Sequence, residues 1–305
     1  MTGAELSTVL TVRDYLWALP ALLVGAVAML AADIATGRVA ANVAFFVLGA
    51  LLVVGARRGS WRLGAPAACV LGGLLLATLL MPGIDGVRRW IDAGPLSINI
   101  SMLVAPLLLV VLARLLDRTH TLAAVGLATS VQVIHLLQPD AAQGAAFAVG
   151  ATLLLLLGVR RPSALELGGA AGLLVLAIAT FTREDPLEPI PEVEGIVGLA
   201  RDAALPLGVL AVLTCVLLAV PFARAASLSR RSHDRLVRAG QAGLCAYVVM
   251  QLLAPIALHA PVPVMGYGAT TVLAYAAAVS ASVLMPRRTR VVPADSPRAR
   301  EDSNL

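Results

Sequence analysis

Ten apolar stretches alternate with short charged segments along the chain. Each stretch is about 15 to 25 residues long, close to the roughly 20 apolar residues that a helix needs to cross a bilayer. In lipid every backbone N–H and C=O group must be paired within the protein, which favours helices over open strands. The apolar runs do not alternate with polar residues as barrel strands do. The pattern therefore predicts an all-α, polytopic integral membrane protein with about ten transmembrane helices.

The polar segments between the predicted spans are too short to form soluble domains. We interpret the first span as an uncleaved helix and not a signal peptide, because nine more follow it. Residues 1–290 are assigned to one transmembrane domain, and the polar stretch 291–305 to a disordered cytoplasmic tail. The spans are Leu16–Ile34, Ala40–Ala56, Leu63–Met81, Ile98–Leu116, Thr121–Leu137, Ala141–Val159, Ala164–Phe181, Gly195–Pro221, Leu236–His259 and Pro263–Met285.

The placement of arginine orients these helices. All 23 basic residues are Arg, and 18 of them fall on the side that carries both termini. The other side has four, namely Arg38, Arg88, Arg89 and Arg183, together with eight acidic residues. Because cytoplasmic loops carry the excess of basic residues, both termini are predicted to be cytoplasmic. An even number of crossings agrees with this, and we call the opposite side the outer side.

Composition supports the membrane assignment and excludes other classes. The chain is 59% hydrophobic and 13% charged, with a mean hydropathy of +0.88. Its pI near 9.7 does not indicate a nucleic-acid partner, because the arginines lie in separate loops and form no continuous basic face. Cys69, Cys215 and Cys245 lie in apolar stretches without metal-ligand spacing, so we interpret them as small hydrophobic residues.

Two outer segments, Pro82–Ser97 and Thr182–Glu194, are long enough to build a site. In the first segment, Arg88 and Arg89 precede Trp90. A guanidinium group binds phosphate in a planar fork and Trp favours the headgroup zone, so these residues are candidates for holding an anionic headgroup. A plain interfacial anchor is the alternative.

Four segments, "RRWIDAGPLSINIS", "LLQPDAAQG", "EGIVGLARDAALPLG" and "PVPVMGYGATT", follow one another along the chain. In this order they resemble the SEDS family, which includes the FtsW and RodA polymerases of bacterial cell-wall synthesis. The second segment is similar to the family's QPD turn and contains Asp140, and the fourth is similar to "PxxSYGGSS" and contains Tyr267. The first matches "ARRWIxLGPxxxQPS" at Arg89, Trp90, Ile91, Gly94, Pro95 and Ser101.

The resemblance implies a catalytic role for Glu194. The family has a catalytic Asp just outside the eighth helix; a gapless alignment puts Glu194 there and Asp202 on a family Glu eight residues later. Eight helical residues rise about 12 Å, so Asp202 is expected deeper in the membrane. Glu194 would take the proton of an acceptor sugar hydroxyl, and partial burial raises a carboxylate's pKa as a base requires. Arg88, Arg89 or a divalent cation would stabilise the leaving diphosphate.

The resemblance also implies substrate, partner and location. The substrate would be a polyprenyl-diphosphate-linked peptidoglycan precursor such as lipid II, bound from the outer leaflet of the bacterial cytoplasmic membrane. The usual partner in the family is a class B penicillin-binding protein, a transpeptidase with one membrane helix. Residues 1–290 would form a SEDS-like domain acting in cell division or elongation. Substrate contacts are expected from Arg88, Arg89, Trp90, Asp140, Asp202 and Tyr267.

The chain departs from the family pattern at this site. Met102 and Ala105 stand where the family has Glu and Lys, and the outer segment before Glu194 is reduced to Thr182–Val193. Glu in place of Asp moves the carboxylate by one methylene, and catalytic geometry is sensitive to shifts of about 1 Å. Two interpretations therefore stay open: a glycosyltransferase with a degenerate active site, and a non-catalytic relative that binds lipid or scaffolds a division or elongation complex.

A transporter for a small solute or lipid is a third interpretation, which paired broken helices in two repeated halves would favour.

Gln132 and His135 share a helix face and are either functional or hydrogen-bonded to a neighbouring helix. Arg201 and Asp202 are expected to pair, either facing the bundle interior or only stabilising packing. The acidic outer loop is interpreted as solvated, with cation binding as the alternative. No P-loop, HExxH or nucleophile elbow occurs.

Overall fold

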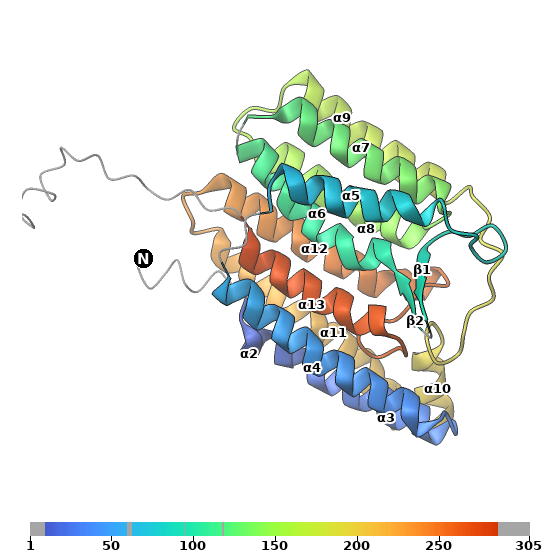
Figure 1. The fold of residues 1–305 in the computed structure, drawn as a ribbon. Helices are drawn as coiled ribbons and strands as arrows, with labels where there is room; N and C mark the ends of the chain where they lie inside the picture. The colour runs from blue at the N-terminus through green and yellow to red at the C-terminus, as the bar shows by residue number, and fades with distance from the viewer. Residues whose placement is uncertain (1–9, 60–62, 95, 118, 286–305) are drawn as a thin grey trace, which may run out of the picture.

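Helices that run back and forth along one direction fill most of the molecule (Figure 1). The computed structural model describes residues 10–59, 63–94, 96–117 and 119–285. The elements are α2 (Val12–Tyr15), η1 (Leu16–Ala18), α3 (Leu19–Ala31), α4 (Thr36–Arg58), α5 (Ala65–Thr78), β1 (Trp90–Ala93), β2 (Leu96–Asn99), α6 (Ile100–Asp117), α7 (Thr121–Leu137), α8 (Ala141–Leu157), α9 (Ala164–Thr180), α10 (Ile196–Ala203), α11 (Leu205–Ser229), α12 (Arg235–Ala257) and α13 (Ala269–Leu284).

The helices match the ten predicted spans. Helices α4, α6, α11 and α12, and the run Val12–Ala31 that joins α2, η1 and α3, are long and apolar enough to cross a membrane. Helices α5, α7, α8, α9 and α13 are shorter and also apolar. Large apolar side chains such as Leu23, Val47 and Val216 are exposed, as expected of helices that face lipid. The prediction of an all-α, polytopic membrane protein is confirmed.

All the predicted outer segments lie at one end of the helices. The hairpin of β1 and β2, helix α10 and the N-terminal end of α13 lie together there, whereas α2 and the C-terminal end of α13 lie at the opposite end (Figure 1). The four predicted outer arginines therefore share one end of the molecule. Segments far apart in sequence meet at this end, so it is the place where a composite site can form.

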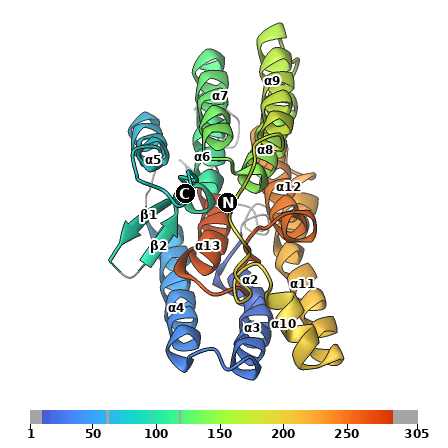
Figure 2. The ribbon, with the colours of Figure 1, turned by 90° about the vertical axis from the view of Figure 1, so that its right-hand side faces the viewer.

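Helices α6 and α13 form the centre of the bundle. Along α6 most side chains are buried, including Leu108, Leu109 and Leu112, and α13 buries Tyr275 and Val279. Viewed along the helices, α5, α7 and α9 lie on one flank of this centre and α3, α4 and α11 on the other (Figure 2). Helices of both flanks thus pack against the central pair α6 and α13, and elements from both flanks meet at the outer end.

The predicted span Gly195–Pro221 and the predicted depth of Asp202 are corrected by the structure. The predicted span Gly195–Pro221 is two helices, because the chain is extended at Ala204 (φ −164°) before α11 begins. Pro206 has no N–H to donate to the preceding turn and its ring crowds that turn, which favours a break in the helix at this position. Helix α10 is amphipathic: it buries Ile196 and leaves Asp202 exposed, so Asp202 lies on a short surface helix and not deeper in a membrane span.

The other differences concern the ends of spans. The predicted outer segment Pro82–Ser97 contains an antiparallel hairpin in which Trp90 pairs with Asn99, so α6 begins at Ile100 and not at Ile98. Helix α13 begins at Ala269, six residues after the predicted start, because Val264 (φ 65°) and Gly268 (φ 131°) have backbone conformations that no helix contains. The predicted tail, residues 291–305, lies outside the described residues.

Helices α8 and α12 pack closely through a pair of glycines. A Cβ atom added at Gly243 would lie 2.6 Å from the Gly150 carbonyl oxygen, and one added at Gly150 would lie 3.0 Å from the Gly243 oxygen. Both neighbouring atoms belong to rigid helical backbone and cannot move aside. Close approach of helix backbones through small residues is typical of packing in membranes.

We expect Gly243→Ala to lower thermal stability in detergent, because overpacking a tight contact costs about 1–3 kcal/mol. The matched control is Gly73→Ala in α5, where nothing lies within 4 Å of an added Cβ. Since Ala has a higher helix propensity than Gly, the control should be neutral or stabilising. An apparent Tm for Gly243→Ala equal to or above that of the control would contradict this packing.

Candidate active site

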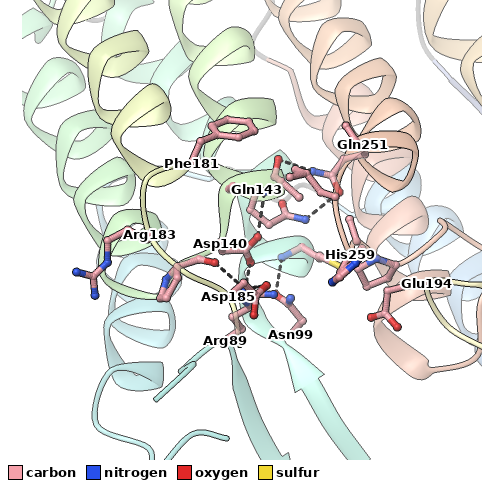
Figure 3. A pocket seen from close by; sticks show the side chains of 18 of the residues that line it. Arg89, Asn99, Asp140, Gln143, Phe181, Arg183, Asp185, Glu194, Gln251 and His259 are labelled. Carbon is pink, nitrogen blue, oxygen red and sulfur yellow. Dashed lines mark hydrogen bonds and ion pairs between the residues drawn. The ribbon is translucent and has the colours of Figure 1, made fainter. Parts of the chain in front are cut away.

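A cleft of about 230 Å³ opens at the outer end of the bundle (Figure 3). The elements around it are β1, the end of β2, the turn between α7 and α8, the segment from 181 to 194 and the end of α12. Its lining residues are Arg89, Trp90, Asn99, Met102, Pro139, Asp140, Ala141, Ala142, Gln143, Phe181, Arg183, Asp185, Glu194, Gln251, Ala257, Leu258, His259, Ala260 and Pro261. The cleft is therefore built from both halves of the chain.

Arg89 joins three of these segments. Its side chain is buried and forms an ion pair with Asp185, donates a hydrogen bond to the Pro139 carbonyl oxygen, and places Nε 3.9 Å from Oδ2 of Asp140. The guanidinium carbon also lies 5.7 Å from the centre of the Trp90 ring. A buried charge is stable only when it is paired and hydrogen-bonded, and Arg89 meets this requirement inside the cleft. Its charge is therefore already balanced by protein carboxylates.

Asp140 begins helix α8 and keeps one oxygen available. Oδ1 accepts a hydrogen bond from the Gln143 backbone N–H at 3.1 Å, as an N-cap carboxylate does. Oδ2 is buried and has no hydrogen-bond partner among the described residues. A buried carboxylate oxygen without a donor is costly, so a bound water or a ligand donor would stabilise it.

Glu194 lies at the opposite side of the cleft, before the membrane-spanning helix α11. Its carboxylate is half-buried and accepts a hydrogen bond from the Ile190 backbone N–H at 2.8 Å. Burial raises the pKa of Glu194, and this outweighs the opposing effects of backbone hydrogen bonds and of the charges of Arg89 and His259. The side chains of Glu194 and His259 lie side by side in Figure 3. A carboxylate with a raised pKa in a cleft is suited to accept a proton.

A chain of polar side chains that the sequence analysis missed forms the inner wall. Nε2 of Gln143 donates to Oε1 of Gln251 at 2.8 Å (Figure 3). Behind this wall, the Tyr247 hydroxyl donates to Oε1 of Gln143 at 3.0 Å. Asn99 and His259 also face the cleft. The position of the glutamines inside apolar runs could have indicated a functional site, because polar side chains within membrane helices are energetically costly.

The structure leaves three of the predicted site residues outside the cleft. Arg88 is exposed and donates to the Leu79 carbonyl oxygen at 3.1 Å. Asp202 forms an exposed ion pair with the adjacent Arg201 at 2.8 Å, which faces away from the bundle interior. Tyr267 packs under the guanidinium group of Arg38, 5.2 Å from its ring centre. Glu194, Arg89, Trp90 and Asp140 are brought together in the cleft lining.

Two other sequence features are located as follows. Gln132 and His135 are fully buried on α7, and their side-chain nitrogen and oxygen atoms have no hydrogen-bond partner among the described residues. Within the part of the chain that the structure describes, no group of three or more His, Cys, Asp or Glu side chains is arranged to hold a metal ion. We therefore assign no metal ligands.

Comparison with known proteins identifies solved structures of the same fold. No family model matches the chain, and no curated protein matches it. The crystal structure of the rod shape determining protein RodA from Thermus thermophilus is similar over 90% of this chain and 96% of that one, with a TM-score of 0.69 and 19% identity. The chain has the fold of RodA.

Two further structures agree. A mutant of the same RodA has a TM-score of 0.69 at 21% identity, over 90% of this chain and 96% of that one. A chain of a peptidoglycan synthase complex that coordinates polymerization and crosslinking has a TM-score of 0.61 at 18% identity, over 88% and 96% of the two chains. The fold expected from the SEDS resemblance is confirmed.

We expect Arg89→Met to destabilise the protein by roughly 3 kcal/mol, because removing one partner leaves a buried charge uncompensated. The neighbouring Arg88→Met is the control; it removes an exposed arginine with one hydrogen bond and should change stability by about 0.5 kcal/mol or less. Adding Asp185→Asn to Arg89→Met should recover part of the loss, since it removes one of the two unpaired carboxylates. Equal melting temperatures for the two single variants would exclude the Arg89 network as a structural anchor.

Proposed function

We propose that the chain is a SEDS-type cell-wall synthesis protein that binds a polyprenyl-diphosphate-linked sugar precursor in the outer cleft and polymerises it by glycosyl transfer. The observation that carries the proposal is the half-buried carboxylate of Glu194, lining a cleft at the outer end of a RodA fold. The position of the cleft supports the proposal over transport, because a transporter site is expected at the bilayer midplane.

The proposed reaction is an exchange of two bonds at the anomeric carbon of the donor sugar. An acceptor hydroxyl oxygen attacks this carbon, the bond from carbon to the diphosphate oxygen breaks, and the polyprenyl diphosphate leaves with the electron pair. Glu194 accepts the hydroxyl proton as the new bond forms and later releases it to water. Because the pKa of Glu194 is raised, its carboxylate is a stronger base than an exposed one.

The leaving diphosphate needs a cation that is free to bind it. Arg89 is already paired with Asp185 and lies beside Asp140, and Arg88 is outside the cleft lining. Arg183 lines the cleft and, within the described part of the chain, its side chain forms no ion pair. We therefore assign the diphosphate contact to Arg183, and give Arg89 the role of fixing Asp140 and Asp185.

Sugar hydroxyl or amide groups of the precursor would bind to the inner wall. Oδ2 of Asp140 accepts no hydrogen bond from any described residue, and Gln143 and Gln251 line the same cleft. A site with unpaired polar groups discriminates strongly against ligands that cannot complete its hydrogen bonds. Trp90, at the rim, offers a flat apolar face that a sugar ring can cover.

Location and partner follow from the same proposal. The protein would lie in the bacterial cytoplasmic membrane with both termini inside, and the cleft would open toward the outer leaflet, where the lipid-linked precursor is bound. A single-span class B penicillin-binding protein would supply crosslinking, as the similar chain from a peptidoglycan synthase complex suggests by analogy. A divalent cation that neutralises the leaving diphosphate would enter bound to the precursor.

A non-catalytic, lipid-binding role is the second candidate, and Met102 favours it. Met102 lines the cleft at the position where the resembled family has Glu. An apolar thioether cannot replace a carboxylate in proton transfer or cation binding. In this case the cleft would hold the precursor for another protein without polymerising it.

Purified protein incubated with labelled lipid-linked disaccharide should form polymer, and Glu194→Gln should lower the rate by about 10²–10⁴-fold because it removes the general base. Glu188→Gln is the control, since Glu188 is an exposed acid of the same segment that does not line the cleft. Precursor binding by the wild type without any polymer would favour the second candidate.

The polymerisation rate should fall as the pH is lowered through the pKa of Glu194, because only the carboxylate form accepts a proton. Burial raises this pKa, so the acid limb of the rate profile should have its midpoint above the ordinary glutamate value of 4.5. Single-turnover rates between pH 4 and 8 would measure it. A midpoint at or below the ordinary value would mean that Glu194 is not the base or is not desolvated.

A further inference from the structure

Arg38 occupies an unfavourable position for a cation. It lies in the first turn of α4, where the helix dipole favours negative charge, and on the predicted outer side, where arginines are few. Its side chain is 47% exposed, so it is not held by burial. The contacts that Arg38 makes with other segments must therefore stabilise it at the start of α4.

Arg38 joins two other segments of the outer end. Its guanidinium group forms an ion pair with Glu192 and lies over the Tyr267 ring, with the guanidinium carbon 5.2 Å from the ring centre. The Tyr267 backbone N–H donates to the Glu192 carbonyl oxygen at 2.7 Å. Arg38, Glu192 and Tyr267 thus contact one another in a closed triangle, which we call the outer clasp.

The next turn of α4 holds the same region by hydrogen bonds. Asn42 lies four residues after Arg38 and so faces the same side of the helix. Its buried side chain donates to the Gly266 carbonyl oxygen at 3.2 Å and accepts from the Gly268 backbone N–H at 3.0 Å. Helix α4, a continuous membrane span, is therefore a rigid support for both sides of Tyr267.

The outer clasp is two residues from Glu194. The adjacent Val193 carbonyl oxygen accepts from the Val262 backbone N–H at 3.3 Å, and a Cβ added at Gly266 would lie 2.5 Å from that oxygen. The backbone that carries Glu194 is thus packed against the segment that Asn42 and Arg38 fix. A continuous set of contacts therefore joins Arg38 to the backbone of Glu194 through Glu192 and Tyr267.

We propose that Arg38 is a positioning residue, which acts through Glu192 and Tyr267 to hold Glu194 at the cleft. The inference rests on the proposed function for its catalytic consequence, and on the contacts alone for its structural one. Tyr267 then supports the outer clasp and does not touch the substrate. This explains why a chain with so few outer arginines places one at the start of α4.

The first experiment measures polymer formation by Arg38→Glu, Glu192→Arg and the double variant. Each single variant should lower kcat by about ten- to hundredfold with KM little changed, because catalysis is sensitive to displacements of about 1 Å. The double variant restores the ion pair in reverse and should recover most of the lost kcat. Arg201→Ala is the control, since it breaks an exposed ion pair at the same end outside the outer clasp. Single variants with unchanged kcat, or a double variant no better than the singles, would overturn the proposal.

The second experiment needs no activity. Glu194→Cys is introduced after Cys69, Cys215 and Cys245 have been replaced by Ala, and the rate of labelling by a water-soluble maleimide is measured. Adding Arg38→Ala should increase the labelling rate at least fivefold, whereas adding Arg201→Ala should leave it unchanged. Equal rates with and without Arg38 would overturn the positioning role even in a protein that makes polymer. If labelling responds but the wild type makes no polymer, the outer clasp stands and the polymerase proposal fails.

Discussion

The outer end of this protein depends on one buried cation. Arg89 brings the hairpin, the turn before α8 and the segment from 181 to 194 to a single point through Asp185, Pro139 and Asp140. Burying a charge without partners would cost several kcal/mol, so these segments are mutually required. The cleft exists because three loops from distant parts of the chain must meet to satisfy this guanidinium group. Its polar wall and its candidate base are consequences of that meeting.

The four outer arginines have separate functions in this arrangement. Arg89 joins the segments around the cleft, and Arg88 donates a hydrogen bond to Leu79 next to its own loop. Arg38 forms the ion pair of the outer clasp, and Arg183 lines the cleft at its edge without an ion pair in the described part of the chain. Each is retained on a side of the membrane where basic residues are disfavoured. The many arginines on the predicted cytoplasmic side orient the helices, whereas the few on the outer side form specific contacts that hold the loops in place.

The lengths of the apolar runs predicted a helix in each of the ten spans, because in lipid the length and polarity of a segment nearly determine its structure. They could not place the break at Ala204, because Pro106, Pro221 and Pro255 lie inside continuous helices and a proline alone does not mark a break. Nor could they place the hairpin at Trp90, which depends on contacts with other loops. The motifs that suggested the site contain Arg89, Asp140 and Glu194, which meet in the cleft. Gln143, Gln251 and His259 were missed because only the tertiary structure brings them to one wall.

Helix length differs between the two flanks of the bundle. Helices α5, α7 and α9 have 14, 17 and 17 residues. On the other flank α4 and α11 have 23 and 25, and the run Val12–Ala31 that contains α3 has 20. At 1.5 Å per residue the first flank spans about 25 Å or less, against a hydrocarbon thickness of roughly 30 Å. A span shorter than the hydrocarbon core is accommodated by local thinning of the bilayer, by snorkelling of flanking residues or by oligomerisation. Where thinning is the response, headgroups beside α5, α7 and α9 lie closer to the midplane, and an amphiphile diffusing there meets the protein at a lowered membrane surface.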